Sequence, residues 1–167
     1  MRGAIHGKSV FGYNTITQQE AWALGAERHD VTGDDPMYLM SDEEFESVIE
    51  EALETIPEKF LEALENVAIV MEDEPDDYHF ETLDEPESLG GSLYEDELLG
   101  LYDGIPLTER DGYYDGDIPD VITIFKGPHE RSFGSREEVV EEIGKTVIHE
   151  IGHYFGIDDE RLHEMGY

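Results

Sequence analysis

The chain has 167 residues, and 10 Lys plus Arg stand against 43 Asp plus Glu, which gives a formal net charge of −33. A field of that sign repels phosphate backbones and anionic lipid headgroups, so neither nucleic acid nor a membrane surface is an expected partner. The length suits one domain with a real core, and the absence of Cys excludes disulfides, thiolate metal ligands and a cysteine nucleophile.

The N-terminal part of the chain differs in composition from the rest. Residues 1–40 mix Gly, Thr, Gln and scattered aromatics without a sustained period, and they end in the turn-forming TGDDPMYLM. We therefore expect a loose extension over 1–40 and a single domain over 41–167. No apolar run has the length of a signal-peptide core or a membrane span, so the expected location is cytoplasmic.

The predicted domain opens with a helix and leads into a strand. Ser41 followed by Glu44 forms a capping box, and apolar residues then recur at helical spacing up to Pro57, which ends or kinks the helix. The sequence EKFLEAL predicts a short second helix over 58–64. The compact apolar run NVAIVMED over 66–73 predicts a strand.

A small sheet is predicted from the middle of the chain. Residues 72–91 are acidic and rich in Pro and Gly, which indicates an exposed loop. Two further strands are predicted, LLGLYDG over 98–104 and VITIFKG over 121–127, joined by a turn-rich connection. Helices and strands in this order favour an α+β fold with about three strands.

The longest helical pattern comes near the end of the chain. Ser135 and Glu138 form a second capping box, and apolar residues follow on or near one face of the helix. Gly156 is the expected residue at the helix C-terminus. Residues 157–167 can then supply one or two further helical turns.

This last long helix carries the sequence HEIGHYFGIDD, which contains the H-E-x-x-H arrangement as His149, Glu150 and His153. Residues four apart project from one helix face about 6 Å apart along the axis, so both imidazoles can bind one zinc ion. Glu150 stands one position further on. It can act as general base, taking a proton from a metal-bound water that attacks a carbonyl and returning it to the leaving amine.

Two His ligands leave a catalytic zinc one protein ligand short, so a third ligand is expected nearby. Gly156 permits a left-handed turn at the helix end, after which Asp159 can fold back and present its carboxylate to the metal. The spacing favours Asp159. Asp158 and His163 are the alternatives for the same position.

Four stretches, taken in order, carry a resemblance to a known family: EALETIPEKFLEALENVAIVMEDEP, LLGLYDGIPLTER, IPDVITIFKGPHER and TVIHEIGHYFGIDDERLHEMGY. Residues 41–167 resemble the small bacterial zincin-like metallopeptidases, a family long catalogued as a domain of unknown function. The resemblance implies a compact α+β minimal zincin, with a mixed sheet of three or four strands packed on an N-terminal helix and a long active-site helix. It also implies zinc at His149, His153 and Asp159, and a catalytic Glu150.

Zincins usually bind the substrate in extended form against an edge strand above the active-site helix. VITIF over 121–125 is the predicted strand, the alternative being that this segment is a buried central strand. His79 and His129 are expected in loops, in surface or capping roles. The candidate oxyanion donors are Tyr113, Tyr114, Tyr154 and Tyr167, among which the sequence does not choose.

The function predicted from these residues is that of a zinc metallopeptidase with one zinc ion per chain and a peptide or protein substrate. The main alternative is a non-catalytic zinc-binding module that contacts a partner protein. A closed site with His163 as fourth ligand would indicate that module, whereas a catalytic site keeps one position open. Hydrolysis of a non-peptide amide or ester would use the same residues.

Overall fold

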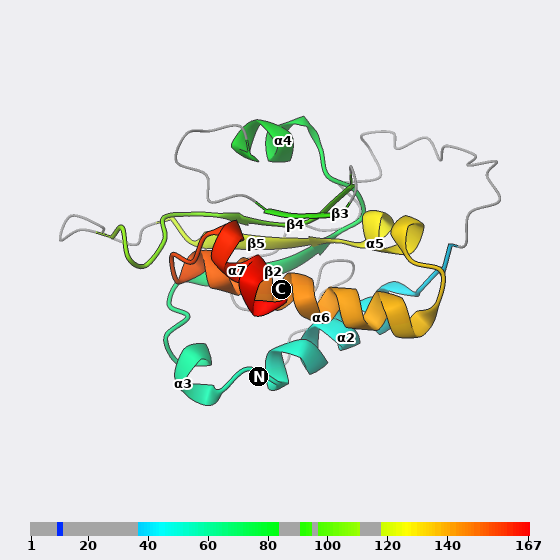
Figure 1. Ribbon diagram of the computed structural model, residues 1–167, viewed down its shortest axis with the longest axis horizontal. Coiled ribbons are helices and arrows are strands. Elements are labelled where there is room, and N and C mark those ends of the chain that lie inside the picture. The colour runs from blue at the N-terminus through cyan, green and yellow to red at the C-terminus, as the bar shows by residue number, and fades with distance from the viewer. Residues whose placement is uncertain (1–9, 12–36, 84–90, 95–96, 111–117) are drawn as a thin grey trace.

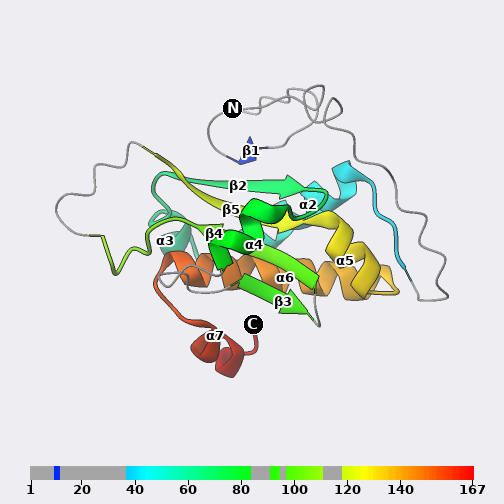
Figure 2. The ribbon, with the colours of Figure 1, turned by 90° about the horizontal axis from the view of Figure 1, so that it is seen from above.

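The computed structural model describes residues 10–11, 37–83, 91–94, 97–110 and 118–167. The strands in these ranges are β1 (Val10–Phe11), β2 (Val67–Glu72), β3 (Gly91–Tyr94), β4 (Glu97–Asp103) and β5 (Asp120–Phe125). They form one five-stranded sheet in the order β1-β2-β5-β4-β3, which can be followed across Figure 2. β2 and β5 are parallel and the other neighbours are antiparallel. The sheet is therefore mixed, as predicted, with the two-residue β1 added to four longer strands.

The described helices are α2 (Asp42–Glu54), α3 (Glu58–Leu61), α4 (Asp77–Leu83), α5 (Lys126–Ser132), α6 (Arg136–Tyr154) and α7 (Asp159–Met165). Helices α2 and α6 lie on one face of the sheet, and α4 lies over the opposite face (Figure 1). The predicted α+β class is thus confirmed. No helix among the described residues is long and apolar enough to cross a membrane.

The hydrophobic core fills the space between the sheet and the pair α2 and α6. Its fully buried side chains include Phe45 of α2, Ile122 and Ile124 of β5, and Ile143 and Val147 of α6. A second, smaller cluster lies in the sheet with Leu83 of α4 packed against it, and it consists of Leu98, Leu101 and Phe125. Because β5 contributes to both clusters, five of its six residues are buried and the burial does not alternate along the strand.

The position of β5 corrects the expectation that VITIF is an edge strand. β5 lies between β2 and β4, so both of its backbone edges are paired within the sheet. The alternative, a buried central strand, is the arrangement that the structure has. The described strand at the margin on the α7 side is β3, which can be seen beside α7 in Figure 2.

The segment predicted as a loop over 72–91 contains regular structure. Helix α4 occupies Asp77–Leu83, and β3 begins at Gly91. The helix has only seven residues, too few for an apolar period to be visible in sequence, and its one buried side chain is a histidine, His79. The other predicted strands agree closely with β2, β4 and β5.

Helix α6 begins and ends as its sequence predicts. The Ser135 hydroxyl accepts a hydrogen bond from the Glu138 amide at 3.3 Å, and the Glu138 carboxylate accepts one from the Ser135 amide at 3.1 Å. Beyond the other end, Gly156 has a φ of 79°, and a Cβ there would lie 2.0 Å from the Thr108 hydroxyl oxygen. Only glycine permits this left-handed turn with the 104–110 segment packed against it.

Part of the predicted extension over 1–40 is described by the structure. Val10 and Phe11 pair antiparallel with Val70 and Ile69 of β2. Met40 is 4% exposed in the main core. The remainder, residues 1–9 and 12–36, lies outside the described residues, and the domain boundary at residue 41 stays a prediction.

Candidate metal centre

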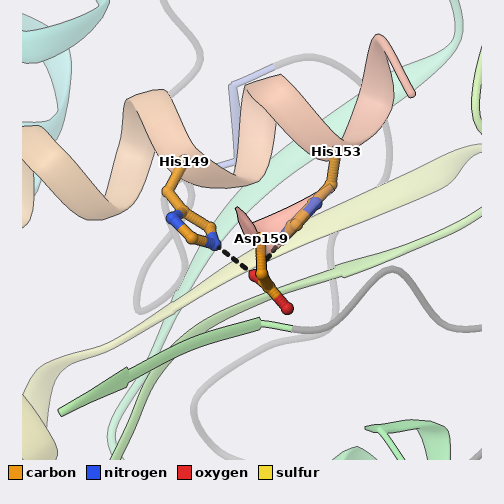
Figure 3. A group of neighbouring side chains, drawn as sticks. All are labelled: His149, His153 and Asp159. Atoms are coloured by element: carbon orange, nitrogen blue, oxygen red, sulfur yellow. Dashed lines mark hydrogen bonds and ion pairs between the residues drawn. The ribbon is translucent and has the colours of Figure 1, made fainter. Parts of the chain in front are cut away.

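Three side chains converge at the C-terminal end of α6. His149 and His153 lie one turn apart on α6, and Asp159 is the first residue of α7. The Asp159 Oδ1 lies 2.9 Å from the His149 Nε2 and 3.2 Å from the His153 Nε2 (Figure 3). Each residue offers one ligand atom, and these atoms all lie within 4.8 Å of one another. Two ligands of a tetrahedral zinc ion are about 3.4 Å apart, so this donor set suits that metal.

The hydrogen bonds of His153 define which of its nitrogens is available to a metal. Its Nδ1 lies 2.9 Å from the Ile157 carbonyl oxygen, which can only accept, so Nδ1 carries the proton and Nε2 presents a lone pair. That Nε2 is buried and has no hydrogen-bond partner. Burial, followed by the neighbouring His149, lowers the pKa of His153 and favours the neutral ring that metals bind.

The cluster opens on one side into a cleft of about 670 Å³. The two histidines are buried, whereas 53% of the Asp159 side chain is exposed, so solvent reaches the cluster from the α7 side. The cleft is lined by residues of β3, α6 and α7 and by the C-terminal residues Gly166 and Tyr167. The cleft thus leaves room for water or a substrate beside His149 and Asp159, which a catalytic zinc site would need.

The two alternatives for the third ligand are placed differently from Asp159. The Asp158 carboxylate caps α7 by accepting a hydrogen bond from the Arg161 amide at 2.9 Å. His163 lines the same cleft. Among the described residues, the group able to share one ion contains Asp159 and neither of these two.

Glu150 of α6 is fully buried, and its carboxylate contacts Ser92 of β3. Its Oε1 accepts hydrogen bonds from the Ser92 amide at 2.9 Å and from the Ser92 hydroxyl at 2.7 Å, while its Oε2 has no hydrogen-bond partner. Burial raises the pKa of Glu150 to about 8, against the lowering effect of the Ser92 hydrogen bonds, and the charge of Asp159 raises it further. A cation bound at the cluster would favour the ionised carboxylate again.

The candidate oxyanion donors differ in their hydrogen bonds and in their position relative to the cleft. The Tyr154 hydroxyl donates to the Ala63 carbonyl and accepts from the Glu65 amide, both at 3.0 Å, so it has no proton left for an oxyanion. Tyr167 lines the cleft. Tyr113 and Tyr114 lie outside the described residues.

His79 and His129 lie in helices and not in the loops that we expected. His79 is on α4 and His129 is on α5, and both side chains are buried. The nitrogens of His129 lie 2.7 Å from the Phe125 carbonyl and 3.2 Å from the Thr146 hydroxyl. Neither histidine belongs to the candidate metal cluster.

Ser92, which donates two hydrogen bonds to Glu150, is not identified by the sequence analysis. It lies just beyond the segment predicted as a loop up to residue 91, among residues without a predicted element, 58 positions before Glu150. Only the short run Leu93 and Tyr94, two residue types found in strands, signals that β3 is present.

The fold brings two histidines of α6 and a carboxylate of α7 together beside a mixed sheet. The sequence profile of the zincin-like metallopeptidases matches residues 64–167, which include β2 to β5 and all three candidate ligands. The chain therefore belongs to the zincin-like metallopeptidase family. A search of curated proteins found no match.

Proposed function

We propose that this protein is a zinc-dependent peptidase that binds one zinc ion at His149, His153 and Asp159. The observation that carries the proposal is the buried Nε2 of His153, which lies 3.2 Å from the Asp159 carboxylate and has no hydrogen-bond partner. Buried polar atoms without partners are rare, and a cation held between the three side chains would satisfy this one. Membership of the zincin-like family supports the same conclusion.

The chain's own residues supply the proton transfers of peptide hydrolysis. Zinc, when bound, is a Lewis acid that polarises the scissile carbonyl and lowers the pKa of water towards about 7. Glu150 accepts the proton of the attacking water and returns it to the leaving amine. Its Oε2 is the oxygen that takes this proton, because Oε1 already accepts two hydrogen bonds from Ser92.

The proposed substrate is a peptide, or a segment of a protein, in extended form. β3 is the marginal strand of the described sheet next to the cleft, and Leu93 and Tyr94 are 60% and 40% exposed on it. A marginal strand offers backbone donors and acceptors to a chain laid alongside. β3 thus takes the substrate-binding role that the sequence suggested for VITIF.

The alternative remains a zinc-binding module that contacts a partner protein without catalysis. Such a module favours a closed site with four protein ligands. His163 could close the site, yet it is not among the described residues whose ligand atoms come together. The exposed side of Asp159 and the presence of Glu150 therefore favour catalysis.

The test is zinc content by plasma mass spectrometry, combined with cleavage of a peptide library. We expect about one zinc ion per chain in the wild type and in Glu150→Ala, and cleavage by the wild type alone. Asp159→Asn should bind zinc more weakly. Asp158→Asn is the matched control, which should keep zinc because Asn retains the capping hydrogen bond to Arg161.

Each result separates the two functions. Chelator-sensitive cleavage that disappears in Glu150→Ala, with zinc retained, establishes the peptidase. Zinc binding without cleavage of any peptide favours the partner-binding module. If the reconstituted wild type holds no zinc, the proposed centre is wrong.

A further inference from the structure

The carboxylate of Glu150 lies in a narrow space between α6 and the paired strands β3 and β4. In this pair of strands Ser92 lies opposite Gly100, and the register shifts between Ser92 and Leu93. A Cβ on Gly100 would lie 2.6 Å from the Thr146 Cγ2 and 3.1 Å from the Glu150 Cγ. Glycine at position 100 is therefore what leaves room for the Glu150 side chain beneath the sheet.

Within this space, Ser92 determines the orientation of the carboxylate. Both of its donors, the amide and the hydroxyl, bind the same oxygen, the Glu150 Oε1. Hydrogen bonds to an ionised acceptor are among the stronger ones in proteins, and here they lie in a buried setting. The two carboxylate oxygens are consequently not equivalent, because Oε1 is held and Oε2 has no partner.

We propose that Ser92 is a positioning residue that holds Oε1 of Glu150 and so leaves Oε2 as the oxygen that takes the proton of the attacking water. The inference rests on the proposed peptidase function. Ser92 itself lines the cleft, but its amide and its hydroxyl both donate to the Glu150 Oε1, so neither donor is left for the substrate and its effect acts through Glu150. Because Ser92 lies on β3, which also lines the cleft, the strand proposed to bind the substrate is the strand that orients the base.

The hydrogen bond from the Ser92 hydroxyl can be removed by mutation while the hydrogen bond from the Ser92 amide remains. Ser92→Ala deletes the hydroxyl at 2.7 Å and keeps the amide at 2.9 Å. We expect kcat to fall about 10-fold to 100-fold, the effect of losing one hydrogen bond to a charged group, with KM within about twofold. Zinc content should not change, since Ser92 is not among the three candidate ligands in the described structure.

Two further variants distinguish positioning from simple packing. Ser92→Thr restores a hydroxyl on a strand residue, and we expect it to recover kcat to within about threefold of the wild type. Ser47→Ala is the matched control, since Ser47 is an exposed serine on α2 and its loss should leave kcat unchanged. Unfolding curves of all variants show whether any loss of activity reflects loss of folded protein.

A readout without substrate or metal completes the test. In the metal-free protein the Ser92 amide is expected to exchange with solvent deuterium at least about tenfold faster in Glu150→Ala than in the wild type, because its acceptor is gone. Unchanged exchange would show that the amide is not bound to Glu150 and would overturn the proposal, whatever the activity.

The remaining outcomes separate this proposal from the function on which it rests. If the wild type cleaves peptides and Ser92→Ala keeps the wild-type kcat, the positioning role is wrong and the peptidase stands. The positioning role is equally wrong if Ser92→Thr is as impaired as Ser92→Ala, since the hydroxyl would then not be what matters. A zinc-loaded wild type without cleavage overturns both.

Discussion

The regions around His129 and His153 both contain a fully buried histidine, and they differ in how the ring nitrogens are used. On His129 both nitrogens have partners, the Phe125 carbonyl and the Thr146 hydroxyl. On His153 only Nδ1 does, and Nε2 lies without a hydrogen bond near Asp159. The satisfied histidine serves the fold, whereas the unsatisfied one marks the place where a bound cation would complete the set of partners.

Substitution of His153 should reduce zinc binding and peptide cleavage more than any other change proposed here. His153→Ala should weaken zinc binding by more than about a hundredfold and abolish peptide cleavage, because a direct ligand matters more than its supporting contacts. The unfolding free energy of the metal-free protein should also fall, by about 1–3 kcal/mol, because the substitution removes the Nδ1 hydrogen bond to the Ile157 carbonyl and empties a buried position. Zinc titration and chemical denaturation measure the two quantities.

His129→Gln tests whether His129 has a structural role alone. It should retain zinc and cleavage in the folded protein, since His129 is neither one of the candidate ligands nor part of the lining of the cleft. Loss of zinc in His129→Gln, with the fold intact, would contradict the division of the two histidines into structural and functional.

Through His129, the stability of the folded protein should depend on pH. Burial lowers the pKa of His129 to about 4 from its ordinary value of 6.5. Between these values the unfolded chain binds the proton more readily, so stability is lost as the pH falls from about 6.5 to 4, on the order of 3 kcal/mol for this group.

The measurement is the unfolding free energy across that pH window in the wild type and in His129→Gln. The wild type should lose more stability than the variant, because the variant has no imidazole to protonate. Equal slopes would mean that His129 titrates in the folded protein as it does in the unfolded chain.

The smallest effect is expected at Tyr154, the direct neighbour of His153 on α6. Tyr154→Phe removes a hydroxyl bound to the backbone at Ala63 and Glu65, so it should lower the unfolding free energy by about 1–2 kcal/mol. Cleavage should stay within about threefold of the wild type. A large loss of kcat at unchanged stability would instead assign Tyr154 a part in the reaction.

The elements that the sequence predicts well are those whose signals are local. The Ser41 N-cap, which accepts a hydrogen bond from the Glu44 amide, and the full capping box at Ser135 begin α2 and α6, and an apolar period follows each of them. The ligand spacing is local too, since His149 and Asp159 are ten residues apart and joined by a glycine turn. Features of this kind depend on residues close together in the chain, so a single sequence is enough to predict them.

Strand order and the surroundings of Glu150 depend on contacts between distant residues. The absence of alternation in VITIF is the signature of a strand covered on both faces, and it is the reason that a buried central strand was the alternative to an edge strand. The Ser92 contact joins positions 58 residues apart through a strand of four residues. No periodicity in a single sequence encodes such a pairing.

The shortness of the His149–Asp159 segment has a consequence for how metal exchange relates to folding. Closing a loop of about ten residues costs little chain entropy compared with assembling strands that span residues 67–125. A cation at this site ties α7 to the end of α6 and joins no strand of the sheet. If metal binds here, we therefore expect it to enter and leave through the local release of α7, while the sheet and the layer of α2 and α6 stay assembled.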